Sequence, residues 1–284
     1  MIYNTDLHIH THYSDGAFSP ERIIKLAKES KLQAISITDH DTIDGILKTQ
    51  AHKMAKKEKI ELINGVEIQG LGSEILGYFF DENNNSLLSL LEKQKKQRTK
   101  YVLKKIEGLN DLNVDISADE VLEKSKPANY LLTTYVAEIM IKKGYVKSIQ
   151  EAFDKYLTKI PVRLEERPLR LKKIIGAVKD ANGLCILPHP WYLKPDFKYE
   201  IETFLIKLKK YGLDGIEVIG YIPDELKTFE DTDFIETIKI IANKYDLLLS
   251  GGSDFHGEKI HPNNILGKYN IPYDYVRRMK ERLI

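Results

Sequence analysis

The sequence predicts an α/β fold in which one barrel-like domain is interrupted by a helical insertion. Short apolar runs rich in β-branched residues alternate with amphipathic segments early in the chain, as is typical of strands followed by helices. The alternation stops after residue 81 and resumes near residue 169, with only helices expected between. Strand–helix–strand units favour right-handed crossovers and a largely parallel sheet. We therefore assign residues 1–81 and 169–284 to the barrel domain and residues 82–168 to an inserted helical subdomain.

Four strands and two helices are expected before the insertion. The first helix begins near Ser19, because this capping serine precedes Pro20 at the first helical position. A second helix is expected from Asp44 to Lys59. The strands are short and bounded by turn residues, and we place them at Ile2–His10, Gln33–Thr38, Ile60–Ile68 and Glu74–Phe80.

The insertion shows helical periodicity along most of its length. Ser117 and Glu120 are spaced as a capping box, in which each side chain bonds the backbone N–H of the other residue. Hinges are expected at Asn83–Asn85 and Glu165–Pro168. The helices are placed at Ser86–Leu109, Ser117–Lys126, Leu131–Lys143 and Ser148–Leu157.

Helices and strands alternate again after the insertion. The single cysteine, Cys185, lies inside an apolar run and is expected to be an inert core residue. We place helices at 170–181, Glu200–Tyr211 and 232–Tyr245, and strands at Leu184–Pro188, Gly215–Ile219 and Leu247–Gly251.

The composition restricts the classes of function. Lys and Arg number 43 against 42 Asp and Glu, for a net charge of +1, so we expect no stable binding of duplex nucleic acid. One cysteine excludes an internal disulfide and fits a reducing compartment. The N-terminus has no secretory signal pattern and no apolar stretch approaches the ~18 residues of a membrane span, so we expect a cytoplasmic protein without a membrane partner.

Histidines and carboxylates follow five of the predicted strands. The carboxyl ends of parallel strands share one face, where the active site of such proteins lies. Imidazole and carboxylate together are ligands for zinc, manganese or iron. Taken singly, each group is also compatible with a helix cap, a turn or a surface side chain, but all those interpretations would have to hold at one end of the sheet. The residues are His8, His10, His12, His40, Glu67, His189, Asp254 and His256.

Other motifs of catalysis are absent from the sequence, which contains no GxGxxG, phosphate-binding loop or GxSxG pattern. The stretch Gly251–Ser253 instead fits a tight turn that brings Asp254 and His256 onto the end of the sheet. His52 lies within a predicted helix, where a structural or exposed side chain is expected, and His261 has no assigned role.

Five motifs together resemble the PHP (polymerase and histidinol phosphatase) family, and in particular its branch of small phosphoesterases that act on nucleotides and RNA ends. The resemblance implies a distorted seven-stranded (β/α) barrel, TIM-like in shape, with two or three divalent metal ions per chain (Mn, Zn or Fe). The motifs follow the family's order along nearly the whole chain: Asp6–His12 with Ser14–Gly16, Ile37–Thr42, Gly65–Ile68, His189–Pro190 and Gly252–Gly257.

The resemblance also implies which residues hold each metal. Glu67 would bridge one metal to a third site that includes His189. Asp39 or Asp41 would orient a metal ligand or cap the following helix. The first metal is expected at His8, His10, Glu67 and Asp254, and the second at Asp15, His40 and His256. The residues expected to carry the catalytic chemistry are His8, His10, Glu67, His189, Asp254 and His256.

Three positions depart from the family pattern. Glu74 stands where relatives have a histidine. Strand polarity places Glu74 at the start of a strand, away from the ligands, so we expect the third metal site to be weakly filled. If Glu74 is a ligand, its carboxylate would favour manganese or magnesium over zinc. Thr133–Tyr135 replaces an Arg-Pro-His or Arg-Thr-His motif, so Arg98 remains the candidate anchor for the substrate phosphate. The alternative for Lys93–Arg98 is a solvated helix face.

These features predict a metal-dependent phosphoesterase that hydrolyses a small phosphorylated substrate, such as a nucleotide or short oligonucleotide, by metal-activated water. Because the family's arginine and histidine are replaced, a metal-dependent hydrolase of a different substrate is the first alternative. The second is a non-catalytic, metal-binding regulatory protein. The complete ligand set argues against it, because imidazoles and acids crowded together without a metal are electrostatically costly.

Overall fold

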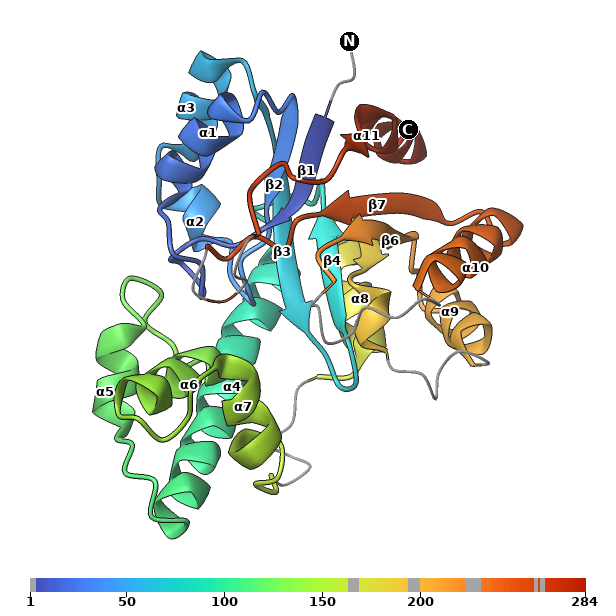
Figure 1. Ribbon diagram of the computed structural model, residues 1–284. Helices are drawn as coiled ribbons and strands as arrows, with labels where there is room; N and C mark the ends of the chain where they lie inside the picture. The colour runs from blue at the N-terminus through green and yellow to red at the C-terminus, as the bar shows by residue number, and fades with distance from the viewer. Residues whose placement is uncertain (1–3, 163–168, 194–199, 223–230, 258–259, 261–263) are drawn as a thin grey trace.

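The computed structural model describes residues 4–162, 169–193, 200–222, 231–257, 260 and 264–284. Figure 1 shows a curved sheet with helices around its outside and a separate group of helices that projects from one end. Ile2, the expected first residue of the first strand, lies outside the described residues.

Eight strands form one curved sheet within the described residues, in the order β7-β6-β5-β4-β3-β2-β1-β8. The sheet nearly closes, because the chain beyond the seventh strand returns to the first: the amide nitrogen of His10 donates to the carbonyl of Phe255 at 2.9 Å. The predicted α/β barrel is confirmed, with a two-residue eighth strand added to the seven expected. The strands are β1 (Asn4–Ile9), β2 (Ala34–Ile37), β3 (Glu61–Gln69), β4 (Glu74–Tyr78), β5 (Leu184–Leu187), β6 (Gly215–Gly220), β7 (Leu248–Gly252) and β8 (Ile271–Pro272).

The direction of β4 departs from the expected parallel arrangement. β4 runs antiparallel to both of its neighbours, β3 and β5, whereas β1 to β3 and β5 to β7 are parallel. Only residues 70–73 separate β3 from β4, which is too short for a crossover helix, so the chain returns as a hairpin. Gln69, the last residue of β3, therefore pairs with Glu74, the first residue of β4.

Helices cover the outside of the barrel. The first begins as predicted, with the Ser19 side chain accepting a hydrogen bond from the amide of Arg22 at 3.3 Å. The single helix expected from Asp44 to Lys59 is wrong, because two helices occupy this stretch. The Thr49 hydroxyl donates to the carbonyl of Gly45 and accepts from the amide of Ala51, which separates them. The helices are α1 (Pro20–Glu29), α2 (Asp44–Leu47), α3 (Ala51–Glu58), α8 (Leu171–Asp180), α9 (Ile201–Lys209), α10 (Asp231–Lys244) and α11 (Tyr273–Arg282).

The projecting group consists of helices between β4 and α8. They are α4 (Asn85–Asp111), α5 (Ala118–Lys124), α6 (Thr133–Lys142) and α7 (Ile149–Ala152), followed by a π-helical turn at Phe153–Leu157. The capping box of Ser117 and Glu120 is confirmed. Apolar side chains of α4, α5 and α6 pack into a core separate from that of the barrel. We retain residues 82–168 as a proposed subdomain; its expected hinge at Glu165–Pro168 lies outside the described residues.

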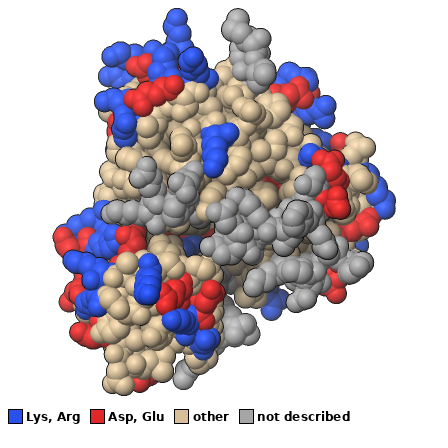
Figure 2. Space-filling model, viewed as in Figure 1, with Lys and Arg blue, Asp and Glu red and all other residues tan. Residues whose placement is uncertain are grey.

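Charged side chains of both signs are mixed on the face shown in Figure 2. Over the projecting helices and the outer helices of the barrel, Lys and Arg lie next to Asp and Glu. This mixture agrees with the net charge of +1 and gives the visible described surface no extended field of one sign.

None of the described helices is both long enough and apolar enough to cross a membrane.

Candidate metal centre

Nine histidine, aspartate and glutamate side chains converge at one end of the barrel among the described residues. They offer ligand atoms in four overlapping sets, within each of which all atoms lie within 4.8 Å of one another. Because the sets share residues, they form three groups: at the end of β1, around Asp15, and around Glu67 with Glu74 and His189. The structure thus brings together the eight ligands expected from the sequence and adds the uncertain ninth, Glu74. The residues are His8, His10, Asp15, His40, Glu67, Glu74, His189, Asp254 and His256.

The first group surrounds the end of β1. The Nε2 atoms of His8 and His10 lie 3.1 Å apart. Asp254 Oδ1 lies 3.4 and 3.3 Å from these two nitrogens, and Glu67 Oε2 lies at the same two distances. Both imidazoles are fully buried. Metal–ligand bonds of about 2.1 Å in a tetrahedral site separate the ligand atoms by about 3.4 Å, so this group has the spacing of a metal site.

The second group is centred on Asp15, in the loop after β1. Its Oδ1 atom lies 3.3 Å from His256 Nε2, 3.8 Å from His40 Nε2 and 3.9 Å from His10 Nδ1. Two of these distances exceed hydrogen-bond length, and the buried oxygen has no hydrogen-bond partner among the described residues. A buried carboxylate oxygen without a donor is costly unless a cation binds it, and this group therefore also fits a metal.

The third group lies between β3, β4 and β5. Glu67 Oε1 is 3.0 Å from His189 Nε2, and Glu74 Oε2 is 3.4 Å from the same nitrogen. Their other oxygens lie 3.0 and 3.8 Å from His40 Nδ1. Glu67 presents its two oxygens to different imidazoles, as a bridging carboxylate does. The expectation that Glu74 lies away from the ligands is wrong, because antiparallel β4 begins where β3 ends.

The carboxylates favour the charged form of the imidazoles. Burial by itself lowers the pKa of His40, but Glu67 and Asp15 raise it to about 10. Burial also opposes the charged form of His189, whose pKa Glu67 and Glu74 raise to about 10. Although burial raises it, the pKa of the Glu67 carboxyl is held well below its usual range by neighbouring imidazoles. The carboxylates thus stabilise positive charge at the imidazoles, which protons supply in the absence of metal. A metal cation would supply positive charge in the same place, so the cluster is suited to release protons and bind metal.

A fifth acid, Glu217 in β6, supports the cluster and was missed from the sequence. Its Oε2 atom lies 3.3 Å from His8 Nδ1 and accepts a hydrogen bond from the backbone amide of His189 at 2.8 Å. The side chain is buried. A lone acid inside the apolar run Gly215–Ile219 was the signal that could have identified it, because an unpaired acid is rarely buried.

Asp39 holds the loop that carries Asp15. Its carboxylate accepts hydrogen bonds from the amide of Thr11 and from the hydroxyl of Ser14, both at 2.7 Å. Within the described residues, the side-chain hydrogen bonds of Asp39 thus join it to the loop after β1.

Arg98 lies on α4 with its side chain buried against the barrel. Nε donates to Asp41 Oδ2 at 2.6 Å, whereas Nη2 is buried without a partner among the described residues. The alternative prediction was that Lys93–Arg98 forms a solvated helix face. This prediction is wrong for Gln94 and Arg98, which are buried, and is confirmed for Lys93, which is exposed. A role of Arg98 in binding phosphate stays a prediction.

Two of the three remaining histidines are described, and both lie outside the cluster. His12 is half-buried and packs edge-on against the ring of Tyr13, with the ring centroids 5.2 Å apart. His52 is exposed on α3. His261 lies outside the described residues.

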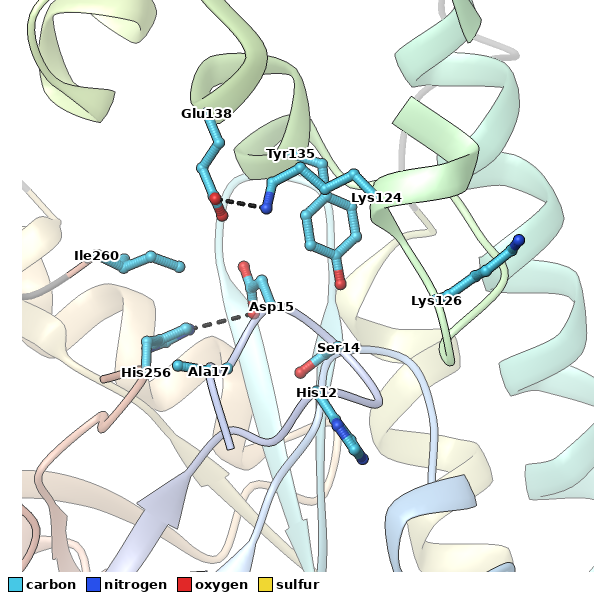
Figure 3. A pocket seen from close by; sticks show the side chains of 11 residues that line it. His12, Ser14, Asp15, Ala17, Lys124, Lys126, Tyr135, Glu138, His256 and Ile260 are labelled. Atoms are coloured by element: carbon cyan, nitrogen blue, oxygen red, sulfur yellow. Dashed lines mark ion pairs between the residues drawn. The ribbon is translucent and has the colours of Figure 1, made fainter. Parts of the chain in front are cut away.

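A pocket of about 190 Å³ adjoins the cluster where the barrel meets the insertion (Figure 3). Asp15 and His256 lie on its barrel side. Tyr135 and the ion pair of Lys124 with Glu138, at 2.6 Å, lie on its insertion side. The pocket therefore gives part of a substrate access to two candidate ligands.

Comparisons with known proteins agree with this geometry. Residues 6–163 match the PHP domain. The chain is 28% identical over 261 residues to a 5'-3' exoribonuclease of Haemophilus influenzae (90% of this chain, 91% of the relative). It is 25% identical to a 3',5'-nucleoside bisphosphate phosphatase of Chromobacterium violaceum (89% and 87%). A crystal structure from Bifidobacterium adolescentis, described as a metal-dependent phosphoesterase, superposes with a TM-score of 0.80 at 25% identity (99% and 96%). The resemblance is confirmed: this chain belongs to the PHP domain family.

Proposed function

We propose that this protein is a metal-dependent phosphoesterase that hydrolyses a small phosphorylated substrate, a nucleotide or a short oligonucleotide. The observation that carries the proposal is the convergence of five imidazoles on the carboxylates of Glu67 and Asp15, at distances of 3.0–3.9 Å. Family membership and the named activities of the relatives, which act on phosphoesters, support it.

The proposed cofactors are two or three divalent metal ions per chain, of Mn, Zn or Fe. When bound, such ions bind phosphoryl oxygens, lower the pKa of water and offset the charge of in-line attack. One metal is assigned to His8, His10, Glu67 and Asp254, a second to Asp15, His40 and His256, and a third to Glu67, His189 and Glu74.

We assign the binding of the substrate phosphate to Arg98. The Nη2 atom of Arg98 keeps a donor without a partner among the described residues, while Asp41 fixes the rest of the guanidinium through Nε. The charged environment supports a permanent cation here: although burial opposes the charge, Asp41 raises the pKa of Arg98 above its ordinary value.

A different substrate for the same metals is the second candidate. Thr133 and Tyr135 stand where the family pattern has an arginine and a histidine. Tyr135 lies on the insertion side of the pocket, together with Lys124, which is ion-paired with Glu138. A neutral hydroxyl and an ion-paired ammonium recognise phosphate differently from a free guanidinium.

A cytoplasmic location is proposed on the single cysteine, Cys185, which fits a reducing compartment.

The test is hydrolysis of a substrate panel by the metal-reconstituted protein. The panel contains phosphomonoesters, cyclic nucleotides, 3',5'-bisphosphates and short 5'-phosphorylated RNA, and Asp254→Asn serves as the inactive control. We expect phosphate or nucleotide release from at least one nucleotide class. Release only from non-nucleotide esters supports the second candidate, and no release from any member contradicts both.

A further inference from the structure

Within the described residues, the insertion reaches the candidate metal centre through hydrogen bonds at the second ligand group. The Thr134 hydroxyl, in the first turn of α6, donates to Asp15 Oδ2 at 2.9 Å. The Tyr130 hydroxyl donates to the carbonyl oxygen of His40. Both contacts join the insertion, at α6 and at the segment before it, to a residue of the second ligand group.

The Thr134 contact fixes the orientation of the Asp15 carboxylate, so that one of its two equivalent oxygens faces the imidazoles. Oδ2 is taken by the threonine hydroxyl, and Oδ1 is left buried without a donor, 3.3 Å from His256 Nε2 and 3.8 Å from His40 Nε2. Rotation of the carboxylate about its Cβ–Cγ bond would break the hydrogen bond. The hydroxyl therefore holds Oδ1 in the position of a metal ligand.

The loop of His40 is held from the same direction. Asp41, the next residue, has a φ of 53°, in the left-handed region that an aspartate adopts only when its surroundings fix it. Its carboxylate accepts from the amide of Gln69 at 2.9 Å and from Arg98 of α4 at 2.6 Å. The side chain of Gln94, also on α4, donates to the carbonyl of Gln69. Helix α4 thus ties the end of β2 to the end of β3.

The other side of the centre is held by the barrel itself. Glu217 in β6 contacts His8 Nδ1 at 3.3 Å and the amide of His189 at 2.8 Å. Asp6 in β1 accepts from the amide of Ser253 at 2.8 Å and so fixes the turn that carries Asp254. These contacts join barrel residues to barrel residues.

We infer that Thr134 is a positioning residue through which the insertion sets the affinity of one metal ion, the one at Asp15, His40 and His256, independently of the ions held by the barrel. This inference rests on the proposed metal centre. It assigns the insertion a role in assembling the centre, in addition to forming one side of the pocket.

The test compares metal binding by purified full-length variants. Metal-free protein is titrated with Zn²⁺ against a chromophoric chelator, and circular dichroism confirms the fold. Thr134→Val removes the hydroxyl at nearly constant volume, and Thr134→Ser keeps it. Thr133→Val is the matched control, one residue away. We expect Thr134→Val to weaken one metal equivalent by about 10- to 100-fold and leave the others unchanged. Thr134→Ser and Thr133→Val should bind as the wild type does.

A second comparison assigns the affected ion. Asp15→Asn should weaken the same equivalent, and adding Thr134→Val to Asp15→Asn should have little further effect. Three results overturn the inference while the metal centre stands. Thr134→Val binds every metal equivalent as tightly as the wild type does, or it binds all of them equally weakly, or Thr134→Ser shows the same loss as Thr134→Val. If Thr134→Val does not fold, the same metal titration is carried out on Thr134→Ala, with the same outcomes expected. A wild-type protein that binds no metal overturns both the inference and the proposed function.

Discussion

Glu217 Oε2 lies 3.3 Å from Nδ1 of His8 and directs the opposite ring nitrogen of His8 into the cluster. Burial lowers the pKa of His8, but Glu67, Glu217 and Asp254 together raise it well above its ordinary value. A carboxylate behind a ligating imidazole fixes the tautomer and the ring orientation and increases the basicity of the ligand. Glu217 is therefore placed to support the metal at the end of β1 from outside its ligand set.

We predict that Glu217→Gln weakens metal binding by about 10- to 100-fold, because an amide is a weaker acceptor and carries no charge. The measurement is a competition titration with a chelator. Glu236→Gln, at an exposed position of α10, is the control and should have no effect. Equal affinity of Glu217→Gln and the wild type would show that the His8 orientation does not depend on this contact.

Asp254→Asn should abolish hydrolysis while the fold persists, because Asp254 Oδ1 lies 3.4 Å from His8 Nε2 at the rim of the barrel. The same loss of activity is expected for His8→Ala. Product release and circular dichroism are measured together, with metal in excess. Turnover at the wild-type rate by either variant rules out their assignment as ligands.

Glu74→His should change the metal content. The side chain reaches His189 Nε2 at 3.4 Å, and an imidazole at this place would supply a neutral nitrogen suited to zinc, whereas a carboxylate suits manganese or magnesium. We expect fewer than three metals per chain in the wild type after dialysis against zinc, and more in the variant. Glu61→His, at the opposite end of β3, is the control. Three tightly held metals in the wild type, unchanged by the substitution, contradict this prediction.

Arg98→Lys should raise KM by about tenfold or more with a smaller change in kcat. A lysine can still pair with Asp41 but has no second arm for a bidentate contact with phosphate. Lys93→Met, on the exposed face of the same helix, is the control. If the steady-state kinetics of Arg98→Lys match those of the wild type, Arg98 does not bind the substrate phosphate, and its role is limited to the contact with Asp41 of the barrel.

Local patterns predicted most of the fold and of the ligand cluster. Helix α1 followed from Ser19 and Pro20, and seven of the eight candidate ligands followed from their places at strand ends, whereas Asp15 followed from the family resemblance. The direction of β4 did not follow, because residues 70–73 were not recognised as a hairpin turn, and the place of Glu74 depends on that direction. The break between α2 and α3 also escaped prediction, since it rests on the hydroxyl of Thr49.

The supporting contacts required the structure because they join distant parts of the chain. Glu217 and His8 are 209 residues apart, and Thr134 and Asp15 are 119 residues apart. No local periodicity reports such pairs. A buried acid in an apolar strand signals that a partner exists, but packing between strands and helices decides which partner it is.

The most direct test of the central claim is release of product from the best nucleotide substrate by one preparation in three states: as metal-reconstituted protein, after chelation, and after metal is added back. Asp254→Asn is carried through the same cycle. The account predicts hydrolysis in the first state, its loss on chelation and its recovery on addition of metal, with no recovery in Asp254→Asn. Hydrolysis that survives complete removal of metal, or that Asp254→Asn carries out equally well, would contradict it.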